Sequence, residues 1–403
     1  MLYSQRNVLA DIHHVLSAQP PIDHYNTVHR RTDGKGSLTL ETPHLVIDGS
    51  QTKRNMEKMA GIASVRGVNL RPHVKTHKIP SIAKQQLESG ATGITVAKVS
   101  EAEVMAGGGI EDIFIAYPLV TESKIRRAIN LIKGGVSLIL GVDSLEGARR
   151  LSEVAASEAS TLEVRLEVDT GLRRTGVVYG EAVGLAERIS PLENLSLSGI
   201  YTYRGAVLQS GAPTLDLERA GLEEGELMVS LASALRVRGI GVEDVSLGST
   251  PTAAYAGAVE GVTEIRPGTY VFYDRMQAKL GVCSLEECAA AVVVTVVSRP
   301  SEDLAVIDGG SKTFATDVQP GTRPLELEGF GHVEGHPGAI LERLTEEHGM
   351  LRVSDDSDLE VGEAVRIIPN HICSTVNLHD QVYLVDEDGG VEELRVEARG
   401  KVS

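Results

Sequence analysis

Apolar residues in this chain occur in two kinds of run, and their alternation predicts a parallel β/α fold. Short apolar runs alternate with segments in which apolar residues recur every three or four positions, most clearly at 125–132 and 145–154. The expected strands are 68–72, 91–97, 112–117, 137–143, 162–169, 197–203, 242–248 and 262–266. Eight short strands separated by helices favour a closed (β/α)8 barrel over an open sheet.

The pattern changes on either side of this region. Residues 1–41 have no strong periodicity and are interpreted as an N-terminal extension, and the barrel region is taken as 42–280, opening with a strand at 42–48 and a helix at 50–66. Beyond it, helical periodicity is weak and Gly-rich turns separate the apolar runs. These runs lie at 289–297, 304–308, 361–369 and 381–385. The sequence therefore predicts a C-terminal β domain over 281–403.

Composition narrows the class of protein. The 403 residues carry a formal charge of −17, which disfavours a nucleic-acid partner or an anionic membrane surface. The three cysteines form no paired framework, and no run approaches the length of a membrane span. We therefore expect a cytoplasmic enzyme that acts on a small molecule.

One short segment stands out for its chemistry. Residues 71–78, with the sequence RPHVKTHK, place two lysines and two histidines where the first predicted barrel strand meets a loop. A lysine amine attacks carbonyl groups when desolvation or nearby cations favour its neutral form. Lys75, between His73 and His77, has such a setting, although a solvated basic loop is the alternative.

Other polar groups follow later strands, at the rim where barrel enzymes carry their active sites. Asp169–Gly176 follows the fifth strand, Tyr203 ends the sixth, and Gly248-Ser249-Thr250 follows the seventh. The last turn offers backbone N–H groups and hydroxyls to a phosphate, although such a turn is also ordinary loop chemistry. A lysine and a phosphate cradle on one rim predict pyridoxal 5′-phosphate held as a Schiff base.

A second candidate site lies near the C-terminus. If the segment around His371 and Cys373 is extended, residues i and i+2 point to the same side and can chelate one ion. Imidazole and thiolate suit Zn²⁺ best, with Mn²⁺ or Mg²⁺ as alternatives and open positions left for water or substrate. A single His-x-Cys pair is also compatible with no metal. Cys283 and Cys288 are expected to be small buried apolar residues.

Seven motifs now carry a resemblance to a known family. They occur in the family's order and together span about residues 42–400. The motifs are 71–78, 169–176, 248–250, 264–270, 307–312, 346–349 and 369–380. The chain resembles the D-threonine aldolase/D-serine dehydratase family, which comprises fold-type III pyridoxal-phosphate enzymes related to alanine racemase. The resemblance implies a barrel, a C-terminal β domain, a divalent metal beside the cofactor, and a homodimer.

The resemblance also assigns roles to individual residues. Lys75 resembles the Schiff-base lysine, and His371 and Cys373 resemble the metal ligands. Further residues are expected to bind the cofactor, with the turn at its phosphate and the remainder near its ring. These residues are His73, Arg174, Tyr203, Gly248, Ser249 and Thr250.

Two departures from the aldolase pattern favour a dehydratase. In D-threonine aldolases the metal site resembles a His-x-Asp motif, whereas this chain has Cys373 in place of the aspartate. Those aldolases also carry a histidine where this chain has Arg204. Retro-aldol cleavage needs a base near the β-hydroxyl, and none is evident at position 204. The main hypothesis is elimination from a D-β-hydroxy-α-amino acid to give a 2-oxo acid and ammonia. The alternatives are a D-threonine aldolase and a non-catalytic carrier of the cofactor.

Overall fold

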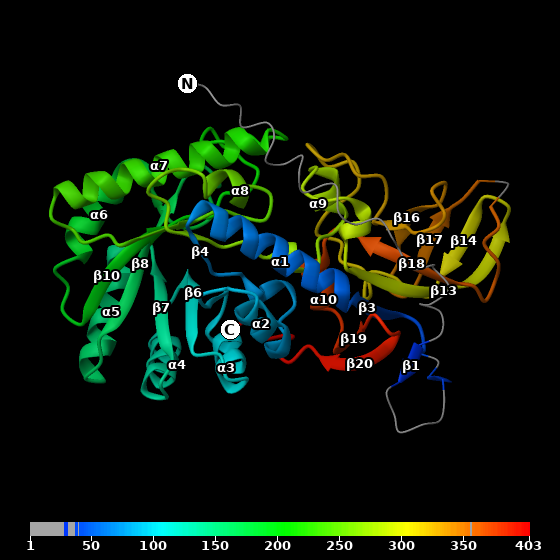
Figure 1. The fold of residues 1–403 in the computed structure, drawn as a ribbon, viewed down its shortest axis with the longest axis horizontal. Helices are drawn as coiled ribbons and strands as arrows, with labels where there is room; N and C mark the ends of the chain where they lie inside the picture. Colours follow the sequence, from blue (N-terminus) through cyan, green and yellow to red (C-terminus); the bar gives the residue numbers. More distant parts are fainter. Residues whose placement is uncertain (1–27, 31–36, 39, 355–356) are drawn as a thin grey trace.

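The computed structural model describes residues 28–30, 37–38, 40–354 and 357–403, so most of the predicted N-terminal extension lies outside the described residues. Two bodies of different architecture lie side by side in Figure 1. One is built around a parallel sheet with helices outside it, and the other is almost entirely β. No helix in the described residues is both long and apolar enough to cross a membrane.

All eight predicted barrel strands are present, and they pair in parallel. Their order is β4-β12-β11-β10-β8-β7-β6-β5. Their bounds are β4 (Asn69–Leu70), β5 (Ile94–Val96), β6 (Asp112–Pro118), β7 (Ser137–Val142), β8 (Leu162–Asp169), β10 (Leu195–Tyr201), β11 (Asp244–Leu247) and β12 (Glu264–Ile265). The chain beyond β4 meets β5 through a parallel bridge between His73 and Thr95, and the Thr95 N–H donates to the Pro72 carbonyl at 2.8 Å. The sheet thus closes, as the strand count predicted.

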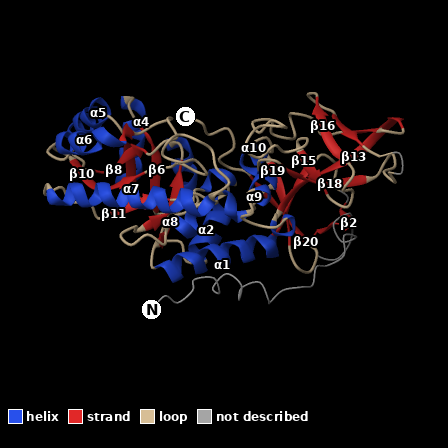
Figure 2. Cartoon of the chain, turned by 90° about the horizontal axis from the view of Figure 1, so that it is seen from above, coloured by secondary structure: helices blue, strands red, loops and turns tan. Residues whose placement is uncertain are grey.

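Helices cover the outside of this sheet, as Figures 1 and 2 show. They are α1 (Gly49–Arg66), α2 (Pro80–Glu88), α3 (Val99–Gly107), α4 (Glu122–Lys133), α5 (Leu145–Ser157), α6 (Ala182–Ile189), α7 (Leu217–Val237) and α8 (Ala253–Ala256). Helix α9 (Arg275–Lys279) lies against the second body instead, where the Met276 N–H donates to the Asn370 carbonyl at 3.2 Å. Apolar spacing explains which face packs inward: α4 buries Ile125, Ala128 and Ile129. The carboxylate of Asp216 begins α7 by accepting the Arg219 N–H at 3.0 Å.

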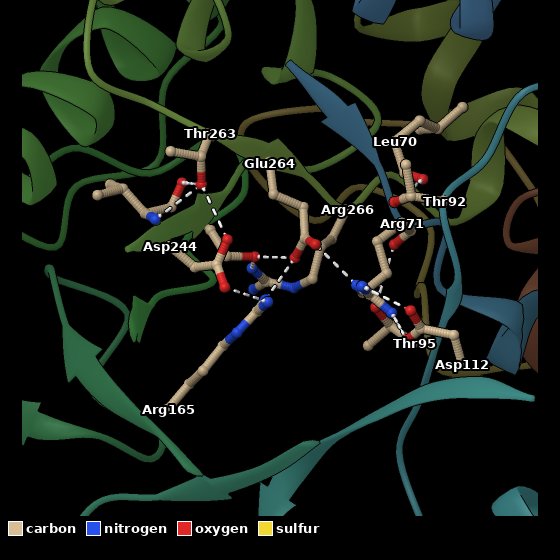
Figure 3. Close-up of polar contacts among 12 residues, drawn as sticks. Leu70, Arg71, Thr92, Thr95, Asp112, Arg165, Asp244, Thr263, Glu264 and Arg266 are labelled. Atoms are coloured by element: carbon tan, nitrogen blue, oxygen red, sulfur yellow. Dashed lines mark hydrogen bonds and ion pairs between the residues drawn. The ribbon is translucent and has the colours of Figure 1, made fainter. Parts of the chain in front are cut away.

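A charged network fills the barrel interior below the rim (Figure 3). The buried carboxylate of Glu264 accepts hydrogen bonds from Arg71 and Arg165, each at 2.7 Å, and from Ser246 at 2.5 Å. Burial opposes its charge, but the two guanidinium groups lower the pKa of Glu264 to about 2. Because these residues come from β12, β8, β11 and the chain after β4, the network ties together the strands that carry the rim loops.

The second body is an antiparallel-rich sheet. It contains β13 (Ala290–Ser301), β14 (Leu304–Ile307), β15 (Gly331–Val333), β16 (Ile340–Leu344), β17 (Gly349–Arg352), β18 (Ala364–Pro369), β19 (Gln381–Val385) and β20 (Gly390–Arg395), with β1 (Val28–Arg30) and β2 (Ser37–Leu38) at one edge. The four apolar runs predicted here are all strands. Strands β15, β16, β17 and β20 escaped the prediction because each is only three to six residues long, which is too short for a clear apolar alternation.

One strand lies in a different sheet from the one its place in the sequence suggests. Strand β3 (His44–Asp48) opens the region predicted as the barrel, yet it pairs antiparallel with β13 and parallel with β19. Leu45 and Ile47 are fully buried there. Helix α1 then crosses from this sheet to the barrel (Figure 1), so the chain passes between the two bodies more than once.

Candidate active site

Three predicted rim residues converge although they come from three different strands. Lys75 lies in a single 3-10 turn, η3 (Val74–Thr76), directly after the first barrel strand. Its Nζ lies 5.3 Å from the centroid of the Tyr203 ring, and the guanidinium carbon of Arg174 lies 5.0 Å from the same centroid. An amine, a guanidinium and a phenol therefore share one location at the rim.

The two histidines that flank Lys75 have different surroundings. Burial and the positive charges of Lys75, Arg266 and Arg174 hold the pKa of His73 well below its ordinary value, so this ring is neutral beside the amine. His77 points elsewhere: its Nδ1 accepts the Ile79 N–H at 3.0 Å, and its Nε2 donates to Gln86 at 3.1 Å. Only His73 belongs to the candidate site.

The loop that carries Arg174 is shaped by hydrogen bonds from its backbone N–H groups to the Asp169 side chain. Asp169 Oδ1 accepts the N–H groups of Gly171 at 2.9 Å and Arg173 at 3.0 Å. Gly171 has φ +134°, and a Cβ at this position would lie 2.6 Å from the Leu208 carbonyl oxygen. Glycine is therefore required where this loop approaches its neighbour.

The predicted phosphate turn is buried and well ordered by hydrogen bonds. Gly248 follows β11 with φ +80°, and Ser249 Oγ lies 2.9 Å from Thr252 Oγ1. Thr250 Oγ1 accepts the Tyr270 N–H at 3.1 Å, which leaves its hydroxyl proton to donate to another group. The turn therefore presents small side chains and a donor, as an anion site requires.

The predicted geometry of the His371 and Cys373 pair was wrong in one respect. His371 is extended, but Cys373 lies in the first turn of a short helix, α10 (Ile372–Val376), so the pair is not on one face of a strand. The local backbone turns into a helix because the carboxylate of Asp274 accepts the Ile372 N–H at 3.1 Å. The two side chains nevertheless interact, since each shifts the pKa of the other.

The electrostatics of this pair suit metal binding. Burial opposes charge on both groups, but the Cys373 thiolate and the Asp317 carboxylate raise the pKa of His371 to about 11. The imidazolium in turn lowers the pKa of Cys373 below its ordinary value. The His371 Nδ1–H donates to Asp317 at 2.6 Å, which leaves Nε2 for an ion. A divalent cation would replace the proton shared by imidazole and thiolate.

The described residues contain no group of three or more His, Cys, Asp or Glu side chains arranged to hold a metal. A metal would thus have His371 and Cys373 as protein ligands, with its other positions open to water or substrate. An imidazole and a thiolate fit zinc by ligand type. Open coordination is the arrangement of a catalytic ion, not of a structural one.

The two candidate sites are adjacent. Cys373 Sγ lies 3.1 Å from the hydroxyl oxygen of Thr76, the residue after Lys75, and 3.5 Å from that of Thr269. Helix α10 therefore presents the thiol beside the turn that carries Lys75. The barrel rim and the second body therefore meet at this point, and each contributes residues to the candidate site.

Some residues of this site were missed by the sequence reasoning. Asp317 belongs to no motif, and nothing in the pattern around it signals its bond to His371. Arg266 lies within the 264–270 motif, but only the fold shows that it is buried close to His73. The absence of an evident base at position 204 agrees with the structure, where the Arg204 guanidinium donates to the Ala220 carbonyl of α7 at 2.6 Å.

Comparison with known proteins agrees with this arrangement. Residues 47–276 match the family model "Alanine racemase, N-terminal domain", and residues 289–385 match the model "Putative serine dehydratase domain". The chain is 34% identical to a D-threo-3-hydroxyaspartate dehydratase of Delftia sp. strain HT23, over 88% of this chain and 97% of that protein. The solved structure of this dehydratase superimposes with a TM-score of 0.82, covering 89% of this chain and 97% of that one at 33% identity.

Relatives with other activities match over similar lengths. A D-threonine aldolase of Arthrobacter is 31% identical over 90% of this chain and 93% of its own length. A D-serine dehydratase of Dictyostelium discoideum is 29% identical over 87% of this chain and 95% of its own length. Two solved variants of a D-threo-3-hydroxyaspartate dehydratase replace a histidine and, two positions later, a cysteine with alanine, and the cysteine variant is in a metal-free form.

The matches cover both bodies of the molecule in one continuous alignment, and the first family model alone spans more than half of the chain. The converging lysine, tyrosine and arginine lie within that model, and the His-x-Cys pair lies within the second one. This chain therefore belongs to the alanine racemase N-terminal-domain family of pyridoxal-phosphate enzymes, in the branch that contains the D-threonine aldolases and D-serine dehydratases.

Proposed function

We propose that this protein is a lyase that uses pyridoxal 5′-phosphate and a divalent metal to convert D-β-hydroxy-α-amino acids into a 2-oxo acid and ammonia. The observation that carries the proposal is the single site described above, in which the Lys75 amine lies over Tyr203 while the Cys373 thiol contacts the neighbouring Thr76. A cofactor held covalently by the Lys75 amine and a Lewis-acidic metal could then act on the same substrate molecule.

The residues divide between two bound groups. Lys75 would hold the cofactor covalently, and Gly248, Ser249 and Thr250 would bind its phosphate. His73, Arg174 and Tyr203 would surround its ring. His371 Nε2 and Cys373 Sγ would hold the metal, for which zinc is the preferred ion and manganese or magnesium the alternatives.

When bound, the cofactor stabilises negative charge at the substrate α-carbon, and the metal polarises the β-hydroxyl so that it departs more easily. Lys75 Nζ would be the base that takes the proton from the substrate α-carbon. Because His73 is neutral, it adds no positive charge that would oppose the arrival of a proton at Lys75 Nζ. The Tyr203 ring, whose centroid lies 5.3 Å from Lys75 Nζ, would help to position that amine.

Two observations favour the dehydratase over an aldolase. A retro-aldol cleavage needs a base at the β-hydroxyl, and Arg204 cannot supply one because a guanidinium stays protonated and this one is hydrogen-bonded to α7. The His-x-Cys pair of this chain also has a counterpart in the histidine and cysteine, two positions apart, that are replaced in the two variants of a D-threo-3-hydroxyaspartate dehydratase. A D-threonine aldolase that releases glycine and an aldehyde is the second candidate, supported by the Arthrobacter relative.

The substrate is drawn from D-serine, D-threonine and D-threo-3-hydroxyaspartate, which are named in the relatives. The exposed Arg173, next to Arg174 on the rim, would favour a second carboxylate despite the net negative charge of the chain. We further propose that the active form is a homodimer and that it resides in the cytoplasm.

Product analysis tests the reaction. The purified enzyme is incubated separately with the three D-amino acids and assayed for 2-oxo acid, ammonia and glycine. We expect ammonia and a 2-oxo acid in equal amounts; glycine with an aldehyde would establish the aldolase instead. Lys75→Ala should abolish the absorbance near about 420 nm of the lysine-bound cofactor. A variant that keeps this absorbance would refute the role of Lys75.

A further inference from the structure

Tyr203 needs support that its own segment does not provide. The residue lies beyond the end of β10, in a stretch without regular secondary structure, and 37% of its surface is exposed. Packing against the core therefore does not hold the ring over Lys75. The proposed function nevertheless requires that ring, because both the Lys75 amine and the Arg174 guanidinium lie close to it.

The next residue is buried and heavily bonded. Arg204 is 1% exposed, and its two terminal nitrogens reach three acceptors on two other segments. One nitrogen donates to Glu223 at 2.9 Å and to the Thr170 carbonyl at 3.2 Å, and the other donates to the Ala220 carbonyl at 2.6 Å. Thr170 belongs to the loop that carries Arg174, and Ala220 and Glu223 belong to α7.

The acceptors are themselves fixed by further contacts. Glu223 also accepts the Gln209 N–H at 2.5 Å, which ties the segment after Tyr203 to the same carboxylate. Its neighbour Glu224 is fully buried near Arg204 and near the Gly248 backbone, and burial raises its pKa to about 7. Helix α7 thus contacts the Tyr203 loop, the Arg174 loop and the phosphate turn.

We infer that Arg204 is a positioning residue, which anchors Tyr203 and the Arg174 loop to α7 and thereby sets both groups around the cofactor bound at Lys75. This inference rests on the proposed function, because it concerns the geometry of that same site. The planar guanidinium is needed because one side chain must reach acceptors in two directions. A lysine ammonium at this position would satisfy only part of the set.

The test uses the purified enzyme and three substitutions. Arg204→Lys keeps the positive charge but loses the planar guanidinium that reaches acceptors in two directions. Glu223→Gln keeps the shape of the side chain but removes the negative charge of this half-buried acceptor. Glu226→Gln is the matched control, because Glu226 is an exposed carboxylate on α7 one turn further along. Cofactor affinity is measured by titration with pyridoxal 5′-phosphate, and cofactor orientation by visible circular dichroism. Thermal unfolding of each apo-protein separates these effects from loss of folding.

We expect Arg204→Lys to weaken cofactor binding about tenfold and to reduce the visible dichroism, because hydrogen bonds to a buried charge are lost. Glu223→Gln should shift both quantities in the same direction by a smaller factor, and Glu226→Gln should match the wild type. If both site variants bind the cofactor with wild-type affinity and dichroism, the inference is wrong. A wild-type enzyme that shows no cofactor band would instead overturn the proposed function itself.

Discussion

At the scale of single residues, Asp317 illustrates how a side chain outside every motif prepares a ligand inside one. Its carboxylate accepts the His371 Nδ1–H at 2.6 Å and the Ser374 hydroxyl at 2.9 Å. The bond fixes the ring orientation and the tautomer that leaves Nε2 free for a metal. The residue is half-exposed and lies in a loop, so its position depends on the same bonds that it makes.

We predict that Asp317→Ala weakens metal binding by about 10- to 100-fold, because the ring of His371 loses the acceptor that orients it. Metal affinity is measured by competition with a chromogenic chelator. Asp303→Ala is the control, since Asp303 is an exposed loop carboxylate that accepts the Ser301 hydroxyl at 2.5 Å. Equal metal affinity in the Asp317 variant and the wild type would contradict the assigned role.

At the scale of elements, α7 packs unusually close to α8 behind the phosphate turn. A Cβ on Gly221 would lie 2.7 Å from Tyr255 Cβ and 2.9 Å from the Thr252 carbonyl oxygen, and one on Gly225 would lie 2.6 Å from Val259. Thr252 in turn bonds Ser249 of the turn. The glycines on this face therefore allow the helix to support the cofactor site directly.

Gly221→Ala should consequently force α7 and α8 apart and lower the free energy of unfolding by about 1–3 kcal/mol. It should also weaken cofactor binding, because Thr252 moves with α8. Gly184→Ala on α6 is the matched control: a Cβ there meets nothing within 4 Å, and the change should stabilise the protein by up to about 1 kcal/mol. Chemical denaturation and cofactor titration measure both effects. Equal stability of Gly221→Ala and the wild type would rule out the close packing.

At the scale of the whole molecule, β3 makes the two bodies dependent on each other. The strand lies between β13 and β19 at the centre of the second sheet, although more than 200 residues of barrel separate it from β13 in the sequence. The Asp48 N–H donates to the Ala289 carbonyl at 2.7 Å, so the end of β3 and the start of β13 are neighbours. The second sheet is incomplete in any fragment that begins after β3.

We predict that residues 281–403 alone show no cooperative thermal transition. A chain in which residues 42–48 are joined to 289–403 by a two-residue Asn-Gly turn should regain one, because β3 and β13 then form a hairpin. Circular dichroism during heating distinguishes the two outcomes. A cooperative transition in the shorter fragment would show that β3 is dispensable.

Local pattern was sufficient for much of this fold. The eight barrel strands and the helix before them follow from apolar spacing, because burial of one face imposes the same period wherever an element packs. The convergence of Lys75, Arg174 and Tyr203 also followed, since parallel strands in a barrel bring their C-terminal ends to one rim. The short strands of the second sheet, with weak periodicity, were beyond this reasoning.

The sequence by itself determined the barrel strands, the helix before them and four of the strands in the second sheet, and it supplied the amine, the phosphate turn and the His-x-Cys pair. Only the tertiary structure decided that β3 joins the second sheet, that Cys373 faces Thr76 and that Arg204 turns toward α7. The physical reason is distance along the chain. Strand pairing and side-chain direction depend on contacts between residues far apart in sequence, whereas periodicity reports only what each element needs to bury.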